Sequence, residues 1–242
     1  MNGSSKGAYL MKFYKVVQVL LFSWLLFGCA KQVGMYSNNL DARYEIVGID
    51  VSKYQGTIDF NKVKQAGAKF VFVRATEGNT YQDANFLVNL AKAREAGLAT
   101  GAYHFYETND DPHTQLDNFK SIVLLRSGDL PPVIDIEKLH NQNKTHLVDN
   151  IQVFLEGLEA HYGVKPILYS GHKFSNKYLT HFGEYPLWIA EYGVDEPRLP
   201  KGWTDWRFWQ WSQSSTMSGI KGQVDANRFN GNDAEFRDLL LK

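Results

Sequence analysis

Short runs of β-branched and aromatic residues alternate with segments of helical spacing along most of this 242-residue chain. The run at 70–73 (FVFV) has no polar alternation, which is typical of a strand buried on both faces. Segment 146–162 carries apolar residues at helical spacing, and Gly163 follows it as a stop signal. Strands that alternate with helices pair in parallel through right-handed crossovers. This alternation constrains the fold more than any other feature.

The whole pattern predicts a barrel. We expect strands at 46–51, 70–73, 101–106, 132–136, 166–169, 187–191, 207–211 and 223–226, and helices at 60–66, 84–96, 112–125, 146–162 and 234–241. Five or more strand–helix units favour a closed barrel over an open sheet. The stretch between the last two strands contains Ser, Thr and Gly and has no helical pattern. We therefore predict an α/β fold, a single irregular (β/α) barrel of the TIM type, whose last strands lack intervening helices.

The N-terminal segment has the organisation of an export signal. Lys12 and Lys15 precede an apolar run at 16–27, which is short for a membrane span and has the length of a signal-peptide core. The run ends beside Cys29, the single cysteine, and the sequence LFGC resembles the lipobox of bacterial lipoproteins, although Phe27 is bulky for its place. A plain signal peptide and an N-terminal membrane anchor are the alternatives.

These observations divide the chain into three parts. We expect a lipoprotein signal peptide at 1–28, a polar tether at 29–44 and one folded domain at 45–242. Lipid on Cys29 would attach the protein to a membrane of the cell envelope, at the outer membrane or the periplasmic face in a Gram-negative cell. One cysteine excludes an intramolecular disulfide, but hydrophobic residues make up 44% of the chain, which is enough for a core without one.

Several classes of function are disfavoured. The 26 basic and 26 acidic residues balance, so the total charge implies no basic face, and we expect no nucleic acid partner. No His pair has H-x-x-x-H spacing with a nearby acid, and no G-x-S-x-G elbow, P-loop or dinucleotide fingerprint occurs. We therefore expect no metal and no cofactor, and we expect a monomer.

Polar side chains lie at or near the ends of nearly every predicted strand. In such barrels the C-terminal strand ends meet at one face, where active sites lie. A barrel does not need these groups for stability, and buried charges are costly unless they are paired. They are Asp50, Arg74, Glu77, His104, Asp135, Glu137, Glu191, Gln210 and Asp225. For His104, a hydrogen-bonding role in the pocket and a place in the core are equally open.

Asp135 and Glu137 are the strongest catalytic candidates. Side chains two apart in a strand point to the same face, roughly 6.5–7 Å apart along the chain, while Ile136 points to the other face. Two carboxyl groups so placed suit glycoside hydrolysis, in which a protonated acid assists the leaving oxygen and an ionised one stabilises positive charge. Repulsion between them separates their pKa values, as this division requires. A metal site or an exposed pair at a strand end is the alternative.

Seven segments, in order, resemble the glycoside hydrolase family 25 lysozymes, also called Chalaropsis-type muramidases. They are residues 48–56 (GIDVSKYQG), 72–78 (FVRATEG), 101–106 (GAYHFY), 133–137 (VIDIE), 187–190 (LWIA), 209–212 (WQWS) and 219–227. The ordered set is specific and extends from about residue 46 to the C-terminus. The resemblance implies an irregular β/α barrel at 45–242. It also implies cleavage of the β-1,4 bond between N-acetylmuramic acid and N-acetylglucosamine in the glycan strand of peptidoglycan.

The resemblance also implies residue roles, carried over by position. Glu137 would be the general acid and later the base, and Asp135 would assist the substrate's own 2-acetamido group or orient water. Asp50 and Asp225 would complete the acidic cluster. The expected sugar-binding residues are Tyr103, Tyr106, Trp188, Gln210, Arg74, Glu77 and His104.

Two positions depart from the family pattern, and two other functions stay open. Arg74 stands where many relatives have Lys and donates in a fixed fork, while Glu191 replaces other polar residues and has no assigned role. A hydrolase of chitin-like or other acetamido-sugar glycans would use the same residues. A non-catalytic glycan-binding lipoprotein would keep the groove, but loss of Asp135 or Glu137 would be its mark, and both are present.

Overall fold

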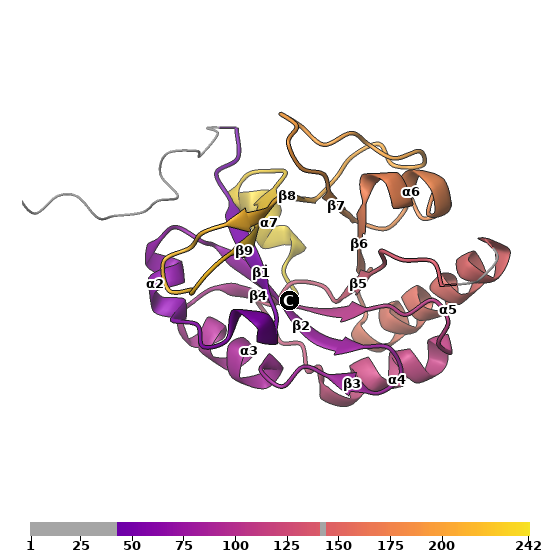
Figure 1. Ribbon diagram of the computed structural model, residues 1–242, viewed down its shortest axis with the longest axis horizontal. Coiled ribbons are helices and arrows are strands. Elements are labelled where there is room, and N and C mark those ends of the chain that lie inside the picture. The colour runs from indigo at the N-terminus through magenta and orange to yellow at the C-terminus, as the bar shows by residue number, and fades with distance from the viewer. Residues whose placement is uncertain (1–42, 141–143) are drawn as a thin grey trace, which may run out of the picture. The chain divides into compact units, whose positions relative to one another are not determined.

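The computed structural model describes residues 43–140 and 144–242, and within them eight strands close into a barrel (Figure 1). The strands of the sheet are β1 (Val47–Val51), β2 (Phe70–Glu77), β3 (Tyr81–Gln82), β4 (Ala99–Phe105), β5 (Val133–Asp135), β6 (Ile167–Gly171), β7 (Leu187–Ala190), β8 (Phe208–Ser215) and β9 (Val224–Phe229). The ring runs β1, β2, β4, β5, β6, β7, β8, β9 and returns to β1, while β3 pairs with β2 outside it. The predicted α/β barrel is confirmed.

Helices follow most strands of the first part of the barrel. They are α2 (Phe60–Gln65), α3 (Phe86–Glu95), α4 (Pro112–Ile122), α5 (Lys144–Tyr162), α6 (His172–Tyr178) and α7 (Asp233–Leu239), with a 3₁₀ turn η1 (Lys53–Gln55). The predicted lack of helices between the last strands is confirmed, because none lies between β7 and β8 or between β8 and β9. None of the described helices is long and apolar enough to cross a membrane.

Local sequence explains where several helices begin. The side chain of Asp59 accepts a hydrogen bond from the Lys62 backbone N–H at the start of α2. At the start of α4, the side chain of Asp111 accepts a hydrogen bond from the Thr114 backbone N–H. Pro112 suits the first turn of this helix because it has no backbone N–H that would need a partner. Asn232 and Glu235 form a capping box at α7. These caps satisfy backbone groups that a helix end would otherwise leave unpaired.

The direction of β9 is one feature that the pattern did not predict. β9 runs antiparallel to both β8 and β1, whereas the other neighbours in the ring are parallel. The short connection at 216–223 explains this, because a parallel pair needs a crossover of a dozen or more residues. The helix α6 and the strand β3 were also not predicted.

The strands separate two buried layers. Val71, Ile134 and Ile136 face the helices, while Phe70 and Phe72 fill the barrel interior. The interior also contains Val133, Ile167, Trp188, Phe208 and Phe229. These residues fill the barrel interior, so a binding site has room only at the C-terminal ends of the strands. The inward-pointing residues there are polar.

The signal peptide, Cys29 and nearly all of the tether lie outside the described residues. Their assignments therefore stay predictions.

Candidate active site

A cleft of about 230 Å³ lies at the C-terminal ends of the parallel strands. All four predicted acids line it, one each from β1 and β9 and two from β5 and the residues after it. Four of the predicted sugar-binding residues also line it. The full lining is Asp50, Val51, Ser52, Tyr54, Gln55, Arg74, Tyr103, Phe105, Asp135, Glu137, Tyr169, Trp188, Gln210 and Asp225.

Asp135 and Glu137 occupy one face, as their spacing predicted. Both line the cleft, whereas Ile136 between them is fully buried in the layer under the helices. The Ile136 N–H donates to the Tyr169 carbonyl oxygen at 3.0 Å, which holds this stretch against β6. Asp135 is only 6% exposed, and its Oδ1 has no hydrogen-bond partner among the described residues. Glu137 is exposed at the mouth of the cleft. The two acids therefore differ in their access to solvent.

Asp50 and Asp225 face each other across the antiparallel pair of β1 and β9. The Oδ2 of Asp50 accepts hydrogen bonds from Asn227 Nδ2 at 2.8 Å and from Gln210 Nε2 at 2.9 Å. Burial and the nearby Asp225 raise the pKa of Asp50 well above its usual value, although these two donors oppose the shift. Burial also raises the pKa of Asp225.

Burial, together with the charges of neighbouring acids, raises the pKa of the other two acids as well. Burial, followed by the charges of Glu137 and Asp50, raises the pKa of Asp135 well above its usual value. Burial also raises the pKa of Glu137, against the opposing charge of Lys138. Since four carboxyl groups share one cleft, they retain protons to a higher pH than isolated carboxyl groups do. The cluster is therefore able to hold a protonated acid beside an ionised one.

Gln210 and Trp188 join the cleft through a polar network at its floor. The Gln210 Oε1 accepts hydrogen bonds from the hydroxyl groups of Tyr169, at 2.8 Å, and Tyr192. Trp188 donates from Nε1 to Asn227 Oδ1 at 2.9 Å and is almost fully buried. Trp188 is therefore a fixed floor and offers little open ring surface.

His104 does not reach the cleft, so its predicted contact with sugar is wrong and its place is in the core. Side chains alternate along β4, and while Tyr103 points into the barrel, His104 lies among the helices. Its ring nitrogens make hydrogen bonds with Thr76 Oγ1 at 2.7 Å and Gln115 Oε1 at 3.0 Å, and the ring stacks on Phe154 at 4.9 Å. Burial lowers the pKa of His104 to about 4.

The same alternation corrects Tyr106. It is buried on the helix side, where its ring packs edge-on against Phe154 at 5.3 Å. Phe105, which the sequence analysis did not select, takes the expected place in the cleft. Counting by twos from Tyr103 along the strand would have identified Phe105.

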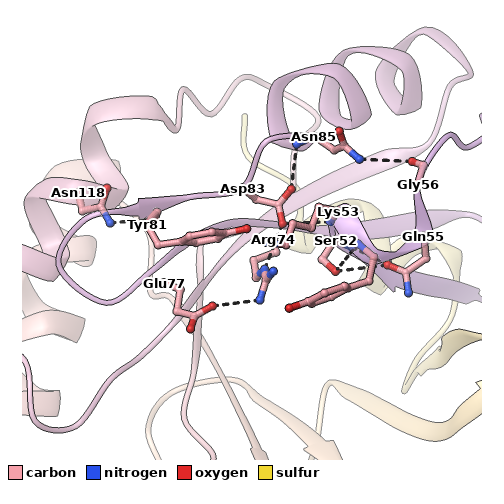
Figure 2. A network of polar contacts seen from close by, with 11 residues as sticks. Ser52, Lys53, Gln55, Gly56, Arg74, Glu77, Tyr81, Asp83, Asn85 and Asn118 are labelled. Atoms are coloured by element: carbon pink, nitrogen blue, oxygen red, sulfur yellow. Dashed lines mark hydrogen bonds and ion pairs between the residues drawn. The ribbon is translucent and has the colours of Figure 1, made fainter.

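Glu77 is the third predicted sugar contact that does not line the cleft. Its Oε2 instead accepts from Arg74 Nη1 at 3.1 Å. Figure 2 draws this contact as a dashed line. Glu77 therefore supports a residue of the cleft from outside it.

Glu191, whose role was left open, lies in a neighbouring hollow of about 440 Å³. This hollow adjoins the cleft at Glu137, which lines both. Glu191 accepts from the side chain and the backbone N–H of Arg198, at 2.7 and 2.8 Å. Tyr54, Gln55 and Tyr169 are cleft residues that the sequence analysis missed, although the segment 48–56 contains the first two. Within the described residues, no group of three His, Cys, Asp or Glu side chains is placed to hold a metal ion.

The fold and the site define a barrel whose C-terminal face holds active sites in this class, and carboxyl groups gathered in one cleft suit glycoside hydrolysis. Residues 49–220 match the model of the glycosyl hydrolases family 25, and the chain belongs to this family. The family named from the sequence is thereby confirmed.

Named relatives support this membership. The chain is 34% identical over 236 residues to the uncharacterized protein YegX of Escherichia coli K12, covering 95% of this chain and 86% of that protein. It is 35% identical over 210 residues to Lysozyme M1 of Streptomyces globisporus, covering 80% of this chain and 71% of that protein. The crystal structure of the bacterial lysozyme from Streptomyces coelicolor superposes with a TM-score of 0.78 at 33% identity, covering 81% of this chain and 96% of that one.

Proposed function

We propose that the protein is a peptidoglycan hydrolase, an N-acetylmuramidase that cleaves the β-1,4 bond between N-acetylmuramic acid and N-acetylglucosamine. The observation that carries this proposal is the cluster of Asp50, Asp135, Glu137 and Asp225 in one cleft of a family 25 barrel. The similarity to proteins named as lysozymes supports peptidoglycan as the substrate.

Glu137 is the general acid in this proposal. It lies at the solvent-exposed mouth of the cleft, where a glycosidic oxygen can approach it. The side chain is exposed overall, but the walls of the cleft partly shield its carboxyl group from water, which raises its pKa and keeps a larger fraction protonated at a given pH. Glu137 gives this proton to the leaving oxygen and then, as a carboxylate, takes a proton from the attacking water.

Asp135 acts on the other side of the reaction. Its unpartnered, buried Oδ1 is able to accept a hydrogen bond from the N–H of the substrate's 2-acetamido group. That contact orients the acetamido oxygen, which attacks the anomeric carbon as an internal nucleophile; orientation of a water molecule is the second route open to the same carboxylate. Asp50 and Asp225 complete the acidic floor, which favours the positive charge that develops on the sugar.

Digestion of purified peptidoglycan by the full chain, with mass spectrometry of the borohydride-reduced products, tests the proposal. Fragments that end in reduced N-acetylmuramic acid are expected. Fragments that end in reduced N-acetylglucosamine would show that the protein is a hydrolase that cleaves the other glycosidic bond of the strand. No release by a folded protein, together with cleavage of chitin-like oligosaccharides, would replace peptidoglycan as substrate. Binding without any cleavage would favour a glycan-binding lipoprotein.

We further propose that residues 1–28 are removed and that lipid on Cys29 anchors the domain at 45–242 to an envelope membrane. The support is the basic and apolar N-terminal pattern that ends at the single cysteine. Metabolic labelling with a radioactive fatty acid should label the wild-type chain and not Cys29→Ser. Equal labelling of both proteins would contradict the anchor.

The protein is proposed to act as a monomer, since one chain supplies all four carboxyl groups of the cleft. Sedimentation of the purified protein should give the mass of one chain.

A further inference from the structure

Asp83, which lies outside the cleft, joins three segments of the chain through one buried carboxylate. Its side chain is fully buried. The Oδ2 accepts from the Lys53 backbone N–H at 3.0 Å and from Arg74 Nε at 3.2 Å, and the Oδ1 accepts from the Asn85 backbone N–H at 2.9 Å. Figure 2 shows these contacts together. Asp83 thereby connects η1, the end of β2 and the start of α3.

The first group that Asp83 holds is the Arg74 guanidinium. Arg74 is the one cation among the described residues that line the cleft. Its guanidinium lies 5.3 Å from the ring centre of Tyr54 and 5.2 Å from that of Tyr81. Glu77 holds its Nη1 from the other end. We call Tyr54, Arg74 and Tyr81 the cation–aromatic wall.

The second group is the η1 turn, which carries Tyr54. Local bonds shape this turn, since the Ser52 N–H donates to Gln55 Oε1 at 2.8 Å and the Gly56 N–H to the Lys53 carbonyl oxygen at 3.0 Å. A three-residue 3₁₀ turn is weak by itself. The bond from the Lys53 N–H to Asp83 ties the turn to the neighbouring loop, so the position of Tyr54 depends on Asp83.

The wall has the properties of a surface that receives a sugar. Tyr54 lines the cleft and yet is 76% exposed, so the face of its ring is open to a ligand. An aromatic face packs against the apolar face of a pyranose ring, and a guanidinium offers several donors in a fixed plane. Neither group belongs to the acid cluster.

We propose that Asp83 is a positioning residue: it fixes the cation–aromatic wall, and the wall places a sugar ring of the glycan in the cleft. The inference rests on the proposed hydrolase function and deepens it. Because the wall holds the sugar and does not exchange protons with the scissile bond, its loss weakens binding equally in the ground state and in the transition state. Such a loss raises KM and leaves kcat nearly unchanged.

The test compares Asp83→Asn with Asp129→Asn in the full chain. Asparagine keeps the shape but has one acceptor oxygen in place of two, so in either orientation its amide nitrogen meets at least one of the three N–H groups that the carboxylate binds. Asp129 is a matched control: it is a buried carboxylate that accepts from Arg94 Nε at 3.1 Å and Thr100 Oγ1 at 2.6 Å, and it does not line the cleft.

Two readouts are measured for each variant. The first is KM and kcat on soluble peptidoglycan strands. The second is limited trypsin cleavage after Lys53, identified by a new N-terminus at Tyr54. For Asp83→Asn we expect KM to rise about 10-fold with kcat within about 3-fold, and cleavage after Lys53 to accelerate about 10-fold. For Asp129→Asn we expect neither change, even where Tm falls.

Each contrary result has a definite meaning. Resistance of Asp83→Asn to trypsin at Lys53, equal behaviour of both variants, or a fall in kcat at constant KM would overturn the positioning role. If Asp83→Asn does not fold, Tyr54→Ala tests the wall, because this exposed side chain is not needed for folding; an unchanged KM would then overturn the proposal. If the wild type cuts no glycan but trypsin still cleaves Asp83→Asn selectively after Lys53, the hydrolase function is overturned. The role of Asp83 in fixing the η1 turn would then stand.

Discussion

At the scale of single residues, two acids two positions apart have different environments. Asp135 is buried under the cleft, and Glu137 lies at its mouth. The strand alternation sets their common direction, and the end of β5 sets the difference in exposure. In the proposed mechanism the exposed Glu137 meets the leaving oxygen, and the buried Asp135 meets the acetamido group of a bound sugar.

Replacement of Glu137 tests the proton donor. Glu137→Gln keeps the size of the side chain but removes the transferable proton, so we expect kcat to fall by roughly 10³-fold. The side chain is exposed, and Tm should change by less than about 2 °C. Kinetics on soluble peptidoglycan and a thermal melt check both parts. A variant with near wild-type kcat would assign the acid to another group.

Replacement of Asp135 separates activity from stability. The folded-state pKa of Asp135 is raised, so the folded protein binds its proton more tightly than the unfolded chain does. The contribution of Asp135 to stability is therefore full in acid and declines as the pH rises through this raised pKa. Asp135→Asn avoids the buried charge and should gain about 1 kcal/mol at neutral pH, or roughly 2–4 °C in Tm, with severe loss of activity.

The control for this prediction is the same comparison in acid. The difference in Tm between Asp135→Asn and the wild type should vanish as Asp135 becomes protonated. A variant that is less stable than the wild type at neutral pH would contradict a destabilising buried charge at Asp135.

His104 has a structural role that a thermal measurement can distinguish from a sugar contact. His104→Ala leaves Thr76 and Gln115 without their buried partner, so unfolding should become easier by about 2–4 kcal/mol. KM measured well below Tm should stay unchanged. The pKa of His104 is about 4 against its ordinary 6.5, so the wild type should lose stability as the pH falls from 6.5 toward 4, and the variant should lack this loss.

At the scale of strands and helices, alternation along each strand decides which residues meet. Tyr103 and Phe105 enter the cleft, whereas His104 and Tyr106 pack under the helices. A register error of one residue would exchange the two sets. The sequence shows that alternate residues point to opposite faces. Which set enters the cleft can be deduced only when the direction of one residue is known.

Glycine at an inward position of β4 makes room for the aromatic interior. A Cβ atom at Gly101 would lie 2.4 Å from Phe72 Cδ1, and the Phe72 ring stacks on Trp188 with centroids 4.3 Å apart. Gly101→Ala should therefore destabilise the protein by about 1–3 kcal/mol and lower activity through the floor of the cleft. Denaturant unfolding and kinetics are the measurements.

Gly171→Ala serves as the control, because a Cβ there would have no atom within 4 Å. Equal effects of the two substitutions would show that the aromatic packing is not the cause.

At the scale of the whole molecule, the barrel closes through strands from the two ends of the domain. β9 lies between β8 and β1 and brings Asp225 and Asn227 beside Asp50. A chain that ends at residue 222 would lack β9 and leave β1 and β8 with unpaired edges. We expect this shorter chain to show no cooperative thermal unfolding when it is followed by circular dichroism. A chain that lacks only Lys242 should still unfold cooperatively. A cooperative transition in the shorter chain would show that closure is dispensable.

The sequence by itself determined the barrel, the missing helices near its end, the Asp135–Glu137 face and the family. Periodicity and short ordered motifs are local properties, and they are legible without coordinates. Only the tertiary structure decided that His104, Tyr106 and Glu77 lie outside the cleft, that β9 reverses direction, and that Asp83 holds the cation–aromatic wall. These outcomes depend on contacts between residues that are distant along the chain, such as the Asp50 and Asn227 pair. A local sequence pattern does not predict such contacts, because they form only when the barrel closes.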